Sequence, residues 1–196
     1  MLSSIKKKNF LLVLISTLLL ALCFYNPNIT EAHTTTCKSG SESVGWAVNC
    51  DSHAGTKYIN YTFSPSLETA YKNFTYTGVA NWNNTSVVSF SYSVSSNNIV
   101  TSHGGPDTST TATTTSWKNP LTGHKTRWEL SYNKYVMDGR TTTQNNATAT
   151  HELGHGIGLK DLKLGSNNNK IMYGYGTRTV STPVSSDITG AREAIQ

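Results

Sequence analysis

Apolar residues recur at every second position in several short stretches of the chain, which is the pattern of half-buried strands. In "KYINYTFS", for example, Ile59, Tyr61 and Phe63 alternate with polar residues. Four further stretches are rich in β-branched and aromatic residues and are separated by turn-forming residues. The strands predicted in this way cover residues 57–64, 86–94, 97–103, 111–117 and 126–133, of which the threonine-rich fourth is expected at an exposed edge.

One longer segment between the first two strands changes to helical spacing. In "SLETAYKNFTYTGVANWNN" (66–84), apolar side chains recur at intervals of three or four residues and continue past Gly78 as far as Trp82. This spacing places them on one face of a helix. Ser66 can cap its N-terminus, and Glu68 supplies a negative charge in the first turn, where the helix dipole favours one.

A second helix is predicted in the C-terminal half and has signals at both ends. Thr141 and Gln144 have the spacing of a capping box at the start of a helix. Gly158 is placed to end the helix, because glycine readily adopts the positive φ that follows many helices. A strand, a helix and then several strands predict an α+β fold with a mixed sheet of about five strands backed by helices.

The N-terminus is more hydrophobic than the rest of the chain. Three lysines in "MLSSIKKKNF" precede the apolar run "LLVLISTLLLALCFY", and small-residue positions follow at Thr30 and Ala32. This arrangement predicts a signal peptide over residues 1–32 with cleavage near His33. An uncleaved membrane anchor would need a longer run, and a lipoprotein anchor at Cys23 fits poorly with the leucine before it. We therefore expect a secreted, extracellular protein with no membrane segment after cleavage.

Export also determines which cysteines remain. Without the leader the chain keeps Cys37 and Cys50, in a compartment where disulfides persist. We predict that they form a disulfide that ties down an N-terminal loop over residues 33–56, ahead of one main domain over residues 57–196. The formal charge of +5 falls to +3 with the leader, which removes three lysines and one glutamate. Such a small and scattered charge excludes nucleic acid as an expected partner.

The predicted second helix carries the strongest chemical signal, "ATHELGHGIGLKD" (149–161). His151 and His155 are four residues apart, so both imidazoles project from one helix face and can bind one ion. Glu152 lies one position round and can take a proton from a water molecule held by that ion. The water would then attack a carbonyl group that the metal polarises. We predict that the two histidines bind one catalytic Zn²⁺ and that Glu152 is the general base.

A catalytic zinc site needs a third protein ligand. Gly158 ends the helix three residues after His155, so the chain can turn sharply and bring Asp161 to the metal. The other downstream acids are weaker candidates for the third ligand. Glu193 is far along the chain and is better explained as a solvated surface charge, and Asp187 as the cap of a C-terminal helix. We therefore predict Asp161 as the third ligand.

These residues resemble the extended zinc signature of the metzincin metallopeptidases, His-Glu-x-x-His-x-x-Gly-x-x-His/Asp, and "IMYG" (171–174) resembles their Met-turn. The version that ends in aspartate is similar to that of the snapalysin-type secreted proteases of bacteria. The order of the predicted elements is similar to that of the matrixins. The segment "SSDITGAREAI" is also similar to the start of the closing helix of the matrixins. The resemblance implies a metzincin-like (zincin) catalytic domain over residues 57–196, with an active-site helix, a Met-turn and a C-terminal helix. It implies a secreted zinc metalloendopeptidase.

The resemblance also implies roles for residues at the Met-turn. Met172 would form an apolar floor under the metal, although a buried methionine with no further role explains the position equally well. Tyr173 or Tyr175 could support the oxyanion, as a tyrosine does in some metzincins. The family places that tyrosine two positions after the methionine, where this chain has Gly174.

The family further implies a protein or peptide substrate that adds a strand to the edge of the sheet, here residues 111–117. We expect a monomer. Two other classes stay open: a non-catalytic secreted zinc-binding adhesion or interaction module with the same fold, and a metal-dependent hydrolase of something other than peptide. The retained Glu152 favours an enzyme, and the edge strand favours a peptide. A structural calcium or second zinc is not assigned, because the spacing of His103, Asp107 and His124 fits a metal site poorly.

Overall fold

The computed structural model describes residues 37–196. The predicted signal peptide (1–32), its cleavage near His33 and the alternative anchor at Cys23 lie outside the described residues. Within the described part, no helix combines the length and apolar character needed to cross a membrane. The elements in chain order are β1 (Gly40–Ser41), the 3-10 helix η1 (Glu42–Val44), β2 (Trp46–Ala47), β3 (Tyr58–Phe63), α2 (Thr69–Asn83), β4 (Ser89–Tyr92), β5 (Ile99–His103), β6 (Ala112–Lys118), β7 (Lys125–Asn133), α3 (Lys134–Met137), α4 (Thr142–Ile157), the 3-10 helix η2 (Gly165–Asn167) and α5 (Ser185–Ala194).

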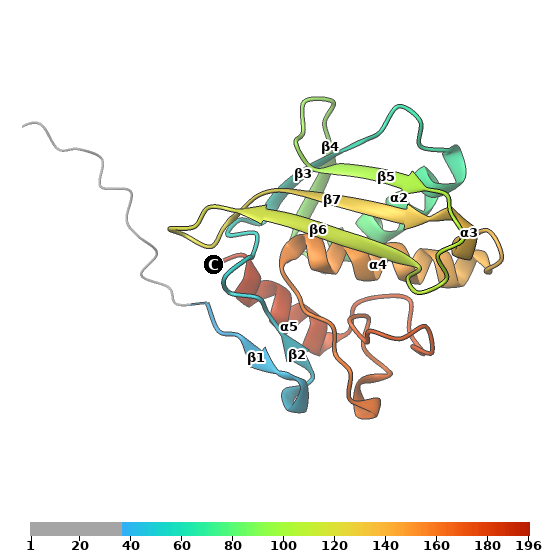
Figure 1. The fold of residues 1–196 in the computed structure, drawn as a ribbon. Coiled ribbons are helices and arrows are strands. Elements are labelled where there is room, and N and C mark those ends of the chain that lie inside the picture. The colour runs from blue at the N-terminus through green and yellow to red at the C-terminus, as the bar shows by residue number, and fades with distance from the viewer. Residues whose placement is uncertain (1–36) are drawn as a thin grey trace, which may run out of the picture. The chain divides into compact units, whose positions relative to one another are not determined.

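The main sheet has five strands in the order β4-β3-β5-β7-β6 (Figure 1). β4, β3, β5 and β7 are parallel to one another, and β6 runs antiparallel to β7. Each of the five predicted strands is present, and the predicted α+β class with a mixed five-stranded sheet is confirmed. β6 stands at the edge of the sheet, as the threonine-rich pattern of residues 111–117 predicts.

Helices cover one face of the sheet and leave the other to solvent. Along β7, Trp128, Leu130 and Tyr132 are buried, while Arg127 and Glu129 between them are exposed. That alternation is expected of a strand with one solvated face. α2 and α4 pack against each other and against the strands on the covered face (Figure 1). Removal of these large apolar side chains from water, at about 25 cal/mol per Å², drives the docking of the helices.

Close contact between α2 and α4 depends on a glycine. A Cβ on Gly78 would lie 2.9 Å from the backbone nitrogen of Thr150 in α4. One turn later, Trp82 is fully buried and its indole nitrogen donates to the carbonyl of Thr150 at 2.7 Å. Since Thr150 directly precedes His151, these contacts fix the distance between α2 and the turn of α4 that begins the predicted metal-binding segment.

α2 begins later than the sequence predicts, and Ser66 does not cap it. The hydroxyl of Ser66 lies 3.0 Å from that of Ser64, and the backbone nitrogen of Leu67 donates to the carbonyl of Ser64 in a turn. Glu68 takes the N-cap position, makes no side-chain cap bond and forms an ion pair with Lys134 instead. Burial of Leu67 in the core requires this turn, and it outweighs the local capping preference.

The N-terminal segment and α5 form a further layer on the other side of α4 from the sheet (Figure 1). A disulfide joins Cys37 to Cys50, as predicted. Trp46 of β2 packs on α5 at Gly190, where a Cβ would lie 3.3 Å from the Cβ of Trp46. The antiparallel pair β1–β2 was not predicted, because two-residue strands are too short to show a period of two.

Candidate metal centre

α4 begins and ends where its capping residues predict. The Thr141 hydroxyl accepts from the backbone nitrogen of Gln144 at 3.3 Å, and the Gln144 side chain accepts from the backbone nitrogen of Thr141 at 3.0 Å. The helix ends at Gly158, which has φ 125°. A Cβ there would lie 2.8 Å from the Cα of His53, so both the backbone angle and the close approach require glycine.

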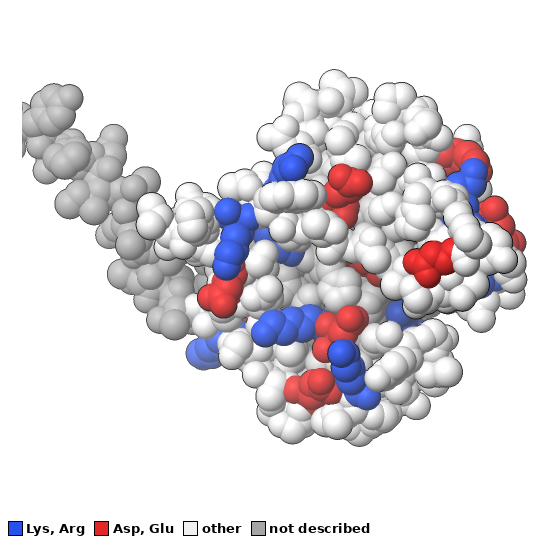
Figure 2. Space-filling view, viewed as in Figure 1, with Lys and Arg blue, Asp and Glu red and all other residues white. Residues whose placement is uncertain are grey.

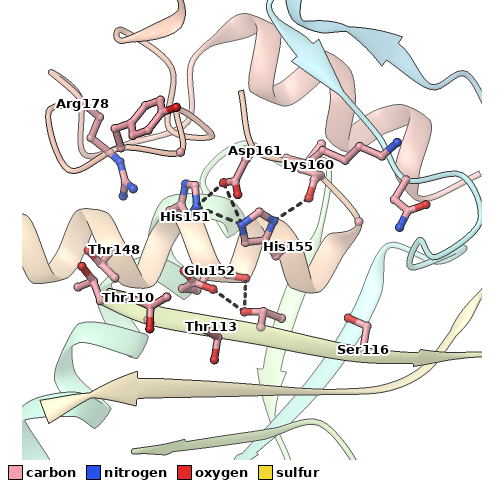
Figure 3. Close-up of a pocket in the computed structure, with 18 of the residues that line it drawn as sticks. Thr110, Thr113, Ser116, Thr148, His151, Glu152, His155, Lys160, Asp161 and Arg178 are labelled. Atoms are coloured by element: carbon pink, nitrogen blue, oxygen red, sulfur yellow. Dashed lines mark hydrogen bonds and ion pairs between the residues drawn. The ribbon is translucent and has the colours of Figure 1, made fainter. Parts of the chain in front are cut away.

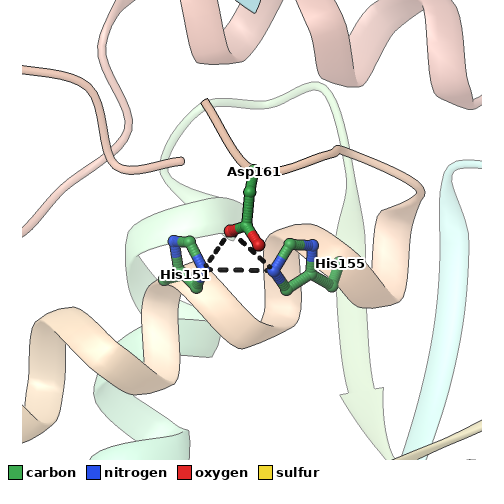
Figure 4. Close-up of side chains that lie close together, drawn as sticks. All are labelled: His151, His155 and Asp161. Atoms are coloured by element: carbon green, nitrogen blue, oxygen red, sulfur yellow. Dashed lines mark hydrogen bonds and ion pairs between the residues drawn. The ribbon is translucent and has the colours of Figure 1, made fainter. Parts of the chain in front are cut away.

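Two backbone hydrogen bonds, made by the residues before and after Asp161, position it beyond the end of α4. The backbone nitrogen of Lys160 donates to the carbonyl of Ala47 at 2.9 Å, which ties the segment to β2. The backbone nitrogen of Leu162 donates to the carbonyl of Met172 at 2.9 Å, which ties it to the Met-turn. Asp161 lies between these two anchors and faces α4 (Figure 4).

His151, His155 and Asp161 bring three ligand atoms together, as Figure 4 shows. The two Nε2 atoms are 3.1 Å apart. Oδ1 of Asp161 lies 3.1 Å from Nε2 of His151 and 3.3 Å from Nε2 of His155. Tetrahedral zinc with bonds of about 2.0 to 2.1 Å separates its ligand atoms by roughly 3.3 to 3.4 Å. The donor set and its spacing therefore fit a tetrahedral ion.

The outer ring nitrogens determine which atoms face the centre. Nδ1 of His151 lies 2.8 Å from the carbonyl oxygen of Ile171, and Nδ1 of His155 lies 2.8 Å from that of Leu159. A carbonyl oxygen only accepts, so each Nδ1 carries the hydrogen and each Nε2 of a neutral ring is an acceptor. Together with the Asp161 carboxylate, three acceptors then face one another. A cation bound between them would stabilise this arrangement.

The charges of these groups follow from their surroundings. Burial lowers the pKa of His151. Burial acts in the same direction on His155, but the hydrogen bond with Asp161 and the charge of Glu152 outweigh it and raise that pKa. Burial opposes ionisation of Asp161, yet the two imidazoles beside it, which would donate to the carboxylate when protonated, hold its pKa well below the usual range. Asp161 is therefore a carboxylate at neutral pH, as a metal ligand must be.

The Met-turn packs against α4 between the two histidines. Met172 is buried, and a Cβ on Gly154 would overlap its sulfur. The buried carboxylate of Asp187 accepts from the backbone nitrogens of Ile171 at 3.1 Å and Met172 at 3.3 Å. It also accepts from the backbone nitrogen of Val184, the N-cap residue of α5, at 2.9 Å. Asp187 thus caps α5 as predicted, and it holds the Met-turn as well, which no sequence pattern indicated.

Glu152 is buried beside the histidines and is held from the edge strand. The hydroxyl of Thr114 in β6 lies 2.8 Å from Oε2 of Glu152 and 3.1 Å from its backbone oxygen. This contact orients the carboxylate of the predicted general base. The sequence did not single out Thr114, because it is one of several threonines in the same strand.

The two tyrosines after the Met-turn occupy different environments. Tyr173 is 8% exposed and packs edge-on against Tyr175, with ring centroids 5.2 Å apart. Tyr175 is 49% exposed and lines the cavity beside the histidines, so of the two its ring is the more accessible from that cavity. Gly174 lies against Asp161, since a Cβ there would be 3.1 Å from the Asp161 Cγ. The glycine that departs from the family pattern thus makes room for the aspartate.

A cavity of about 930 Å³ extends along β6, and its lining includes His151, Glu152, His155 and Asp161. Figure 2 shows this face of the molecule hollowed between the sheet and the layer beneath it. No other group of three or more potential metal ligands converges within residues 37–196.

The residues considered for a structural metal do not form such a group and have other contacts. His103 Nδ1 lies 2.9 Å from the Ser131 hydroxyl, and Asp107 accepts from Ser109. The ring of His124 packs edge-on against His53, with centroids 4.9 Å apart.

Comparison with known proteins gives matches among solved structures alone. No family model and no curated protein matches the chain. Among solved structures, the chain is similar to high choriolytic enzyme 1, a hatching enzyme zinc-protease from the medaka fish Oryzias latipes. The identity is 15% and the TM-score 0.45, over 81% of this chain and 98% of that chain. A similarity of this size assigns no activity to the chain. A function must therefore be inferred from the geometry of the site.

Proposed function

We propose that the protein is a secreted zinc-dependent endopeptidase of the metzincin type. The observation that supports it most is the convergence of three acceptors, Nε2 of His151, Nε2 of His155 and Oδ1 of Asp161, at the spacing of a tetrahedral ion. Zinc, when bound there, supplies a Lewis acid that lowers the pKa of water and polarises a carbonyl group. The disulfide supports an extracellular location, where such bonds persist.

Glu152 would act as the general base. Its Oε2 is bonded to Thr114, while Oε1 has no hydrogen-bond partner in the described part of the chain. Oε1 is therefore the atom that takes the proton from the attacking water and returns it to the leaving amine. Thr114 keeps the carboxylate in that orientation through both transfers.

Asp161 sets the charge of the site. Two neutral imidazoles and one carboxylate would leave a bound Zn²⁺ with a formal charge of about +1, as in the His₂Glu sites of working metallopeptidases. The carboxylate offsets part of the field of the ion, so the site should acidify water less than a site with three histidines. Aspartate in this position is compatible with catalysis.

The edge strand supports a peptide as substrate. β6 pairs with β7 on one side, and the cavity runs along its other side, where it is lined by residues 109–114 and by Ser116. An extended peptide could hydrogen-bond to the open edge as an additional strand. This favours an endopeptidase over a hydrolase of other substrates, and the retained Glu152 favours it over an adhesion module.

The test compares zinc content and cleavage of an unfolded protein by the parent and two variants. Glu152→Gln should keep zinc and lose at least about a hundredfold in activity, because the base is gone and the ligands remain. Asp161→Ala should lose zinc affinity. Glu129→Gln, which removes an exposed carboxylate of β7, should change neither quantity. Normal zinc content and activity in Asp161→Ala would disprove the ligand assignment, and an active Glu152→Gln protein would disprove the mechanism.

A further inference from the structure

Two arginines stand at one end of the cavity. Arg140 follows α3, and Arg178 follows the Met-turn. Both line the main cavity and also an adjoining pocket of about 140 Å³ between α4 and residues 176–181. Figure 3 shows the guanidinium of Arg178 beside His151, directed toward α4. Within residues 37–196, neither arginine forms an ion pair with a carboxylate.

The hydrogen-bonding capacity of the two guanidiniums is largely unused. Nη1 of Arg178 donates to the carbonyl of Ala147 at 3.1 Å, and Nη1 of Arg140 donates to the hydroxyl of Thr148 at 3.0 Å. Each guanidinium has five N–H donors. Nε of Arg178 is buried and has no partner among the described residues. A partly buried cation without an anion is unfavourable, because it has lost hydration without a compensating charge.

The nearest carboxylates cannot serve as the missing anion. The charges of Glu152 and Asp161 act on Arg178, but Glu152 accepts from Thr114, and Oδ1 of Asp161 is directed at the two histidines, 3.1 and 3.3 Å from their Nε2 atoms. With zinc in place, the formal charge at this end of the cavity would be about +2. This sum counts the ion, the two carboxylates and the two arginines. An anionic group of a ligand would therefore be attracted.

The direction of β6 indicates which part of a peptide would reach the arginines. β6 runs from Ala112 to Lys118. Figure 3 shows Thr110 and Thr148 toward one end of the cavity and Ser116 toward the other. Antiparallel pairing is the more stable arrangement for an added strand. A peptide bound in this way places the residues C-terminal to the cleaved bond at the end where the arginines lie.

We propose that Arg140 and Arg178 bind a carboxylate of the substrate at the residue that follows the cleaved bond. The carboxylate can belong to an Asp or Glu side chain or to the free C-terminus of a short peptide. Either presents two oxygens that match the fork of a guanidinium. The inference rests on the proposed peptidase function and specifies its substrate class.

Blocked, internally quenched peptides with Asp, Asn or Ala after the cleaved bond test the side chain as the source. A pair of peptides that end one residue after that bond, as free acid or amide, tests the terminus. The parent should cleave the Asp peptide, the free acid or both with a kcat/KM at least about tenfold above the neutral counterpart. Arg178→Gln and Arg140→Gln should each remove most of this preference. Arg192→Gln, which removes an exposed arginine of α5, should retain it.

Equal kcat/KM values for the charged and neutral peptides would overturn the inference, as would a preference that survives in both arginine variants. A preference for an acidic residue before the cleaved bond would overturn it too. Arg178 also contacts α4, and if Arg178→Gln does not fold for that reason, Arg140→Gln and Arg178→Lys decide the question. Arg178→Lys keeps the charge but not the fork of the guanidinium, and each variant should reduce the preference for the charged peptides.

Failure of the proposed function would be distinguishable, because the parent would then cleave none of the peptides. Binding of the same fluorescent peptides to zinc-loaded Glu152→Gln protein, followed by anisotropy, measures the carboxylate preference without catalysis. Tighter binding of the charged peptides that is lost on Arg140→Gln would support the inference. Equal binding of charged and neutral peptides would overturn it.

Discussion

Gly174 shows how a single residue makes room for Asp161, the proposed third ligand. A Cβ at this position would lie 3.1 Å from both Cβ and Cγ of Asp161 and 3.2 Å from its Oδ1. Gly174 is not among the glycines with positive φ, so the backbone itself does not require glycine there. The requirement is space, because the side chain of Asp161 passes directly over the turn on its way to the histidines.

We expect Gly174→Ala to weaken zinc binding about tenfold, the lower range for changes to groups that orient ligands. The added methyl group would push the Asp161 carboxylate by a few tenths of an ångström away from the histidines. Gly176→Ala is the matched control, since no heavy atom lies within 4 Å of a Cβ built there. Zinc competition against a chromophoric chelator measures both affinities. An unchanged affinity in Gly174→Ala would show that Asp161 is not confined by this contact.

At the scale of elements, α4 and β7 meet at a partly buried lysine, Lys125. Nζ of Lys125 donates to the carbonyl of His155 and, at 3.3 Å, to that of Gly156. These carbonyls belong to the last turn of α4, whose partial negative charge favours a cation. Burial acts against the charge and lowers the pKa of Lys125 to about 7. The C-terminal end of α4 is therefore coupled to a titrating group.

The lowered pKa of Lys125 predicts a pH dependence of stability. Its ordinary value is 10.5, so between pH 7 and 10.5 the unfolded chain binds more protons than the folded one. The free energy of unfolding should therefore rise with pH in this window, by roughly 1 kcal/mol per pH unit from this group. Lys125→Met should lack this rise. Urea denaturation of both proteins across the window measures the difference, and parallel pH profiles would contradict the prediction.

At the scale of the whole molecule, the metal site joins two layers. Its histidines belong to α4, which packs against the sheet, whereas Asp161 belongs to a segment bonded to β2 and to the Met-turn. The Met-turn is in turn held by Asp187 of α5. An ion bound by all three ligands would cross-link the layers on either side of the cavity.

Metal removal should therefore lower the thermal stability of the entire molecule. Zinc that binds the folded chain alone adds about 4 kcal/mol to the free energy of unfolding at a thousandfold excess over its Kd. A chelator should lower Tm by several degrees, and added zinc should restore it. Calorimetry of the parent and of Asp161→Ala measures the effect, which the variant should largely lose. A parent Tm that is indifferent to chelation would exclude zinc as a cross-link.

The sequence by itself determined the features that depend on near neighbours in the chain. Alternation in residues 57–64, together with stretches rich in β-branched and aromatic residues between turns, identified the five strands, and Thr141, Gln144 and Gly158 marked both ends of α4. The pairing of His151 with His155 also follows from helix geometry, because residues four apart share a face. Each of these inferences needs only the local backbone conformation, which local side chains largely set.

Only the tertiary structure decided which distant segments meet. The contact of Thr114 with Glu152 and the position of Arg178 beside His151 join parts of the chain that no period or spacing relates. Packing also overruled a local signal, since burial of Leu67 moved the start of α2 past Ser66. Such contacts depend on how sheet and helices dock, and docking is the sum of many apolar contacts rather than a property of one segment.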